Sequence, residues 1–174
     1  MVFRLGNYTL DIDVKKTRAF YDRPDIFTAG KACECIDCQN FDKAILTSSG
    51  TVLDFLRSLG IDPQKPTEIY NVIGDLEDAG TVWYNGWYYV CGTVLALPES
   101  FQERKQNDNY LWENGYLPDR DLPFLVLPML SQDLLHEEFP LPAIQLFVDT
   151  HLPYVLPCAY TRQVRTIIVE DPRE

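Results

Sequence analysis

The sequence has no long apolar run, and this absence excludes one class of protein. No segment approaches the roughly 18 consecutive apolar residues that a membrane-spanning helix needs. The first residues, Met1 to Asn7, also lack the charged stretch followed by an apolar stretch that is typical of a secretory signal. We therefore expect a cytoplasmic protein whose thiols lie in a reducing compartment.

Basic residues and histidine are scarce as well. The chain has 15 lysines and arginines against 26 aspartates and glutamates, a formal net charge of -11, and only two histidines. A surface of this charge repels the phosphates of nucleic acids and the headgroups of anionic lipids, and two histidines cannot build a site of several imidazoles. We expect no nucleic-acid and no membrane partner. A protein partner and the oligomeric state stay open.

The sequence also lacks the short motifs that mark the common nucleotide-dependent and hydrolytic enzymes. There is no GxxxxGKS/T phosphate loop, no GxGxxG after a strand, no HExxH and no GxSxG. Carboxylates occur in scattered groups, such as Glu137 with Glu138, that are typical of solvated surfaces. Whether the chain is an enzyme stays open, but these absences favour a protein that binds rather than one that catalyses.

The residues that are present predict an α+β fold in a single domain, residues 1–174. Hydrophobic residues make up 46% and charged residues 24% of the chain, as in a folded globular protein. From residue 8 to residue 14 apolar and polar residues alternate, which is the period of a strand with one buried face. Helical spacing follows at about 39–46 and at about 50–59. We expect these short helices to pack on an antiparallel sheet.

The ends of the second helix carry recognisable signals. Ser48 or Ser49 can accept a bond from a free backbone N–H group at its start. Gly60 stands where a helix commonly ends in a left-handed residue.

A hairpin is expected at about 81–95. Asn85 and Gly86 lie between two apolar runs, and both tolerate the positive φ that the central residues of a type I′ turn need. The hairpin would have two apolar faces, so it is either covered on both sides or exposes one face as a binding surface. Residues 143–150 alternate as a further strand, and 164–169 favour a closing one.

Three cysteines within six residues form the only dense chemical feature of the sequence. Cys33, Cys35 and Cys38 stand just before the first predicted helix. Thiolates bind zinc and other soft metals strongly, and a CxxC turn lets two sulfurs share one tetrahedral centre. Three sulfurs leave the fourth ligand position of a tetrahedral site open. Cys91 is the possible fourth ligand, and Cys158, His136 and His151 are further candidates.

Other readings of the same cysteines stay open. Cys35 and Cys38 can form a redox dithiol at a helix N-terminus, where free N–H groups stabilise a thiolate. However, the residues before them lack the apolar strand that delivers such a motif in thioredoxin-like proteins. A nucleophile paired with histidine and three merely structural cysteines are the remaining alternatives.

Two stretches, CECIDCQNF at 33–41 and LGIDPQKPTE at 59–68, resemble a family of bacterial proteins with a CxCxxCxNF motif followed by LGIDPxKPxE. The residues around Asn85 and Gly86 add to this resemblance. It implies a bacterial, cytosolic origin. The family has no assigned activity, so no catalytic residue can be carried over.

The sequence therefore supports three functional hypotheses. The first is a non-enzymatic intracellular binding or interaction protein whose cysteine cluster holds a structural metal such as zinc. The second is a thiol-disulfide redox protein that uses Cys35 and Cys38. The third is an acidic antagonist that masks a basic protein partner.

Overall fold

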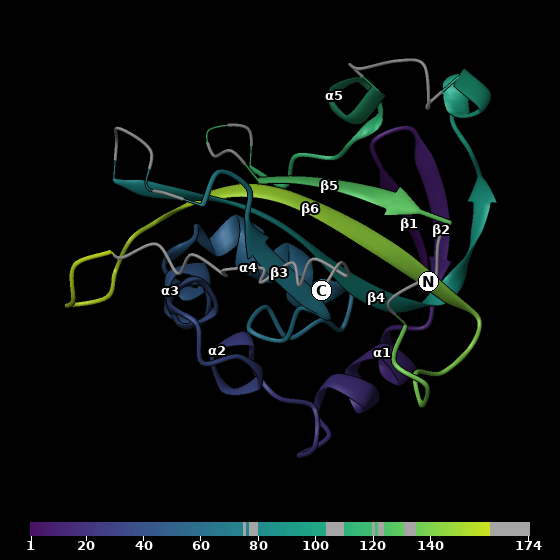
Figure 1. Ribbon diagram of the computed structural model, residues 1–174. Coiled ribbons are helices and arrows are strands. Elements are labelled where there is room, and N and C mark those ends of the chain that lie inside the picture. The colour runs from purple at the N-terminus through teal and green to yellow at the C-terminus, as the bar shows by residue number, and fades with distance from the viewer. Residues whose placement is uncertain are drawn as a thin grey trace, which may run out of the picture.

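The computed structural model describes residues 1–74, 76, 80–103, 110–119, 121, 124–130 and 135–160. The expected closing strand at 164–169 lies outside these residues. The molecule is an antiparallel sheet with the helices α1, α2 and α3 gathered on one side and α5 at the opposite side (Figure 1). Among the described residues, no helix combines the length and the apolar character that a bilayer span requires. The α+β prediction is confirmed.

Six strands build the sheet, in the order β1-β2-β4-β6-β5, with β3 paired to β4 beside this path. Every pairing between them is antiparallel. Their bounds are β1 Val2–Leu5, β2 Tyr8–Ile12, β3 Glu68–Asn71, β4 Thr81–Ala96, β5 Phe124–Met129 and β6 Ala143–Pro153. The strands expected near residues 8 and 143 are therefore present.

The expected hairpin at 81–95 is wrong. β4 runs without a break through 16 residues, and Asn85 and Gly86 lie in its first half, opposite Asp149 and Val148 of β6. Gly86 has no positive φ. It is required for another reason: a Cβ atom there would lie 2.6 Å from the main-chain oxygen of Glu68 on β3. Glycine inside a strand often marks such a close backbone approach.

A two-residue hairpin does occur, at the other glycine and asparagine pair of the sheet. Gly6 and Asn7 join β1 to β2, with Leu5 opposite Tyr8. Gly6 has a φ of +57° and Asn7 has no positive φ, which is the pattern of a type II′ turn. β1 is not predicted from the sequence, because a strand of four residues is too short to show a clear alternation of apolar and polar residues.

Helix α1, Val14–Tyr21, replaces the end of the expected N-terminal strand. Asp13 accepts a bond from the N–H of Lys16 and so caps the helix, which turns Val14 from a strand residue into a helical one. The helix covers the edge of β4 between β3 and β2. There the Tyr21 hydroxyl bonds the main chain of Tyr89, and the Thr17 hydroxyl accepts from the N–H of Cys91. These side chains satisfy strand groups that no neighbouring strand reaches.

Both helices predicted after the cysteines are present. α3 spans Ile36–Ala44 and continues as the 3-10 turn η1, Ile45–Thr47, and α4 spans Gly50–Ser58. Ser49 caps α4 by accepting from the N–H of Val52, and Gly60 follows its end with a φ of +85°. The remaining elements are α2 Ala29–Ala32, η2 Glu99–Glu103 and α5 Tyr110–Asn114.

The two faces of β4 have different surroundings. Even-numbered residues from Val82 to Val90 are buried, with Tyr84 packed edge-on against Phe41 of α3. Of the odd-numbered residues, Tyr89 is buried whereas Trp83, Asn85 and Trp87 are half-buried. Because side chains alternate along a continuous strand, the even-numbered residues share one face of β4 and the odd-numbered residues share the other. The first face packs in the core, and part of the second is open to solvent.

Candidate metal centre

Two short helices meet at the cysteine cluster. Cys33 ends α2, with its backbone N–H donating to the oxygen of Ala29 at 3.0 Å. Cys35 is the N-cap of α3, and its Sγ accepts from the N–H of Cys38 at 3.4 Å. The chain is extended at both Cys33 and Cys35, and these residues connect the two helices. The CxCxxC spacing therefore brings three sulfurs to one corner.

The three sulfurs are close enough to share one ion. All Sγ atoms lie within 4.8 Å of one another. Zinc–sulfur bonds of about 2.3 Å in tetrahedral geometry put sulfurs roughly 3.8 Å apart, so small side-chain adjustments close the site. Cys33 and Cys35 are half-buried and Cys38 is 8% exposed, which leaves the cluster open to solvent on one side. The cluster can hold a metal.

Polar contacts fix the corner from within. Gln39 donates from Nε2 to the main-chain oxygen of Glu34 at 2.8 Å and so closes the loop between the outer cysteines. The Asp42 carboxylate accepts from the Thr28 hydroxyl at 3.1 Å and from Gln64 Nε2 at 3.0 Å. The start of α2, the last turn of α3 and the turn after α4 are joined by this one carboxylate.

Helix α3 is also tied to the sheet. The Tyr84 hydroxyl of β4 donates to the main-chain oxygen of Asp37 at 2.9 Å. Asn40, which is fully buried, donates to Tyr84 and to the oxygen of Pro153, and accepts from the N–H of Val155. Cys35 and Cys38 therefore stand on a helix whose position the core determines.

Two thiols of the cluster, those of Cys35 and Cys38, favour their protonated form. Burial, followed by the neighbouring thiols of Cys35 and Cys33, raises the pKa of Cys38 far above its usual value. Burial also raises the pKa of Cys35, against the opposing effect of the bond from the Cys38 N–H. Without a metal, deprotonation would place like charges side by side in a partly dry site.

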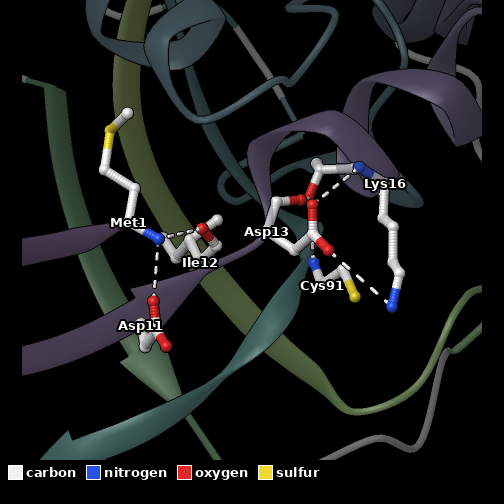
Figure 2. Close-up of polar contacts among 7 residues, drawn as sticks. Met1, Asp11, Ile12, Asp13, Lys16 and Cys91 are labelled. Carbon is white, nitrogen blue, oxygen red and sulfur yellow. Dashed lines mark hydrogen bonds and ion pairs between the residues drawn. The ribbon is translucent and has the colours of Figure 1, made fainter.

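Cys91 does not join the cluster. It lies on β4 beside Asp13 and Lys16 at the start of α1 (Figure 2). Its main-chain oxygen accepts from the N–H of Asp13 at 2.8 Å. Tyr84, which contacts the helix of the cluster, is seven residues away along the same strand. At about 3.3 Å per residue this is roughly 23 Å of strand. Cys91 therefore lies outside the group of close sulfurs, because β4 carries it away from the part of the strand that contacts α3.

The other candidates for the fourth position have other neighbours. His151 stacks on Trp83 with ring centroids 5.4 Å apart, and His136 meets the edge of Phe20. Cys158 Sγ lies 3.4 Å from the Tyr154 hydroxyl. In the part of the chain that the structure describes, only the sulfurs of Cys33, Cys35 and Cys38 form such a group.

Sequence reasoning found the three cysteines and missed the residues that hold them. Asn40 and Tyr84 anchor the cluster to the sheet, and Asp42 joins α2 to α3. Asn40 carried a usable signal, since it is a polar residue beside Phe41 and one turn before Ala44, on the helix face predicted to be buried. Tyr84 carried none, because its partner is distant in sequence.

Comparisons with protein-family models, with curated proteins and with solved structures gave no match to the chain. The interpretation of the cysteine cluster therefore depends on its geometry and on the chemistry of its donors. Three convergent thiols at the junction of α2 and α3 are the basis of the proposal that follows.

Proposed function

We propose that the chain is a non-enzymatic binding protein in which Cys33, Cys35 and Cys38 hold a structural zinc ion. The observation that carries this proposal is the convergence of three Sγ atoms within 4.8 Å at the junction of α2 and α3. Thiolate ligands in a tetrahedral arrangement are typical of structural zinc sites. The described residues supply three convergent thiols, so the fourth ligand of a closed structural site has to come from another group.

The thiol pKa values favour metal binding over redox exchange. A reactive dithiol needs a lowered pKa, because the thiolate is the attacking species. Cys35 and Cys38 have raised pKa values, and Cys35 receives only one backbone N–H bond at the helix start. A metal ion removes this obstacle, since its charge stabilises all three thiolates together.

The position of the cluster supports a structural role for the ion. α2 has four residues, and a helix of that length gains little from its own hydrogen bonds. An ion bound by Cys33 at the end of α2 and by Cys35 and Cys38 at the start of α3 would link the two helices covalently. The ion would then stabilise a corner that is otherwise held by a few polar contacts.

The raised pKa values of three buried tyrosines have a structural explanation. Burial raises the pKa of Tyr21, Tyr84 and Tyr88, and each of these hydroxyls donates to a main-chain oxygen of the core. Catalytic groups with altered pKa values instead face a cleft that substrate can enter. These tyrosines therefore serve the fold.

Metal analysis of the purified protein tests the proposal. We expect about one zinc per chain, lost in Cys35→Ser and in Cys38→Ser, and a lower melting temperature after a chelator removes the ion. Cys158→Ser is the matched control, because this exposed thiol lies outside the cluster, and it should keep the zinc. A chain that binds no added zinc, with all five cysteines titrating as free thiols, would overturn the proposal.

A further inference from the structure

The open face of the sheet carries an acidic group between two pairs of rings. Asp149 of β6 lies opposite Asn85 of β4. Two residues away on one side Trp83 lies opposite His151, and two residues away on the other side Trp87 lies opposite Phe147. Partners in an antiparallel register share a face, as do residues two apart on one strand. A short carboxylate therefore stands between longer aromatic side chains.

Contacts hold these rings in place. Trp83 and His151 stack with an interplanar angle of 12° and centroids 5.4 Å apart. Trp87 packs against Phe147 at 5.9 Å and against Tyr70 of β3 at 5.8 Å. The aromatic groups are therefore part of the folded sheet and need no ordering when a ligand arrives.

Among the described residues, the hydrogen-bond partners of the Asp149 carboxylate are all neutral. It accepts from Trp83 Nε1 at 3.2 Å and from Asn85 Nδ2 at 2.8 Å. The described ion pairs of the chain include neither Asp149 nor Glu68, the exposed acid opposite Trp87 on β3. Strands β3, β4, β5 and β6 contain no lysine and no arginine. This face is therefore negatively charged and aromatic, and its own strands supply no lysine or arginine.

The open region has clear borders. On β5 the same face carries Leu125 and Leu127, which are buried. Along β4 it ends at Tyr89, which packs against Phe139. The half-buried residues Trp83, Asn85, Trp87, Phe147, Asp149 and His151 lie between these borders, with Tyr70 and Glu68 exposed at the β3 side.

We propose that this face, centred on Asp149, docks an arginine- or lysine-bearing extended segment of a basic partner protein. A cation placed over the indole and phenol rings is attracted by their negative faces, and more strongly where water is partly excluded. The carboxylate between the rings adds a direct ion pair, and the net charge of -11 attracts a basic partner at longer range. The chemistry of the surface and the charge of the chain select the same occupant.

The same features disfavour single-stranded nucleic acid, the other ligand that stacks on aromatic surfaces. Its bases would suit Trp83 and Trp87, but a groove for its backbone needs positive charge, and Asp149 and Glu68 supply negative charge instead. The proposal names a partner for the binding role proposed above. It does not depend on the zinc ion.

Fluorescence anisotropy with a short synthetic peptide of alternating arginine and serine tests the docking. A peptide with glutamine in place of arginine is the ligand control. Asp149→Asn removes the central charge and keeps the size of the side chain, so we expect the Kd to rise about tenfold. Glu68→Gln, at an exposed position that tolerates substitution, should raise the Kd about threefold.

Asp54→Asn is the matched protein control. It removes the same charge from α4, where Asp54 is 82% exposed, and should leave the Kd unchanged. Equal losses in Asp54→Asn and Asp149→Asn would overturn the proposal, as would unchanged binding in both Asp149→Asn and Glu68→Gln. Equal affinity for the glutamine peptide, or displacement by a thymidine oligonucleotide, would also overturn it. Metal content, measured on the same samples, reports separately on the zinc proposal.

Discussion

The Tyr21 hydroxyl of α1 both donates to the main-chain oxygen of Tyr89 and accepts from its N–H, each at 3.0 Å. Tyr89 lies on β4 between the stretch of that strand that pairs with β3 and the stretch that pairs with β2. A single side chain thus takes the place of a neighbouring strand, and the helix is held at the sheet edge by it.

Replacement of Tyr21 by phenylalanine should destabilise the protein by about 2–3 kcal/mol. The change leaves both main-chain groups of Tyr89 buried without this partner, and each unpaired group costs about 1–3 kcal/mol. Denaturant unfolding measures the loss. Tyr70→Phe, at a tyrosine 40% exposed, should change stability by less than about 0.5 kcal/mol. Equal stability of the two variants would contradict the bridging role.

Stability should fall in alkali, because burial raises the pKa of Tyr21, Tyr84 and Tyr88 above the ordinary value of 10.0. Above about pH 10 the unfolded chain releases these protons and the folded chain keeps them, so the free energy of unfolding decreases as pH rises. Melting temperatures between about pH 8 and pH 11 report the slope. Tyr21→Phe should make the slope shallower. If every tyrosine ionised near pH 10 while the fold stayed intact, the three buried tyrosines would not have raised pKa values and the prediction would fail.

Zinc affinity should rise steeply with pH. The thiols of Cys35 and Cys38 keep their protons in the metal-free chain, since burial raises their pKa values, so zinc binding must displace protons. Competition with a coloured chelator at several pH values measures the effect. A pH-independent affinity would show that the ion is bound by other groups.

Gly86→Ala should destabilise the protein by about 1–3 kcal/mol. The added Cβ atom would lie 2.6 Å from the main-chain oxygen of Glu68, so β3 would have to move away from β4. Gly50→Ala is the control, because a Cβ atom at the start of α4 meets nothing within 4 Å. That variant should be neutral or slightly more stable. Thermal unfolding distinguishes the two, and an unchanged melting temperature for Gly86→Ala would refute the close approach.

Local patterns in the sequence determined the elements whose cause is itself local. The alternation from Tyr8 to Ile12 gave β2, and helical spacing with Ser49 at one end and Gly60 at the other gave α4. The CxCxxC spacing determined that Cys33, Cys35 and Cys38 meet at one corner, since sulfurs so close in sequence at a helix start cannot lie far apart.

Only the tertiary structure decided the features that depend on distant partners. Asn85 and Gly86 have the composition of a turn, but β3 and β6 pair with the chain on both sides and hold it straight through these residues. The same strand, β4, carries Cys91 away from the other cysteines, and its pairing with β6 leaves Asp149 between rings on an open face. Backbone pairing between remote segments outweighs local turn preference, because each added strand satisfies a whole row of N–H and C=O groups.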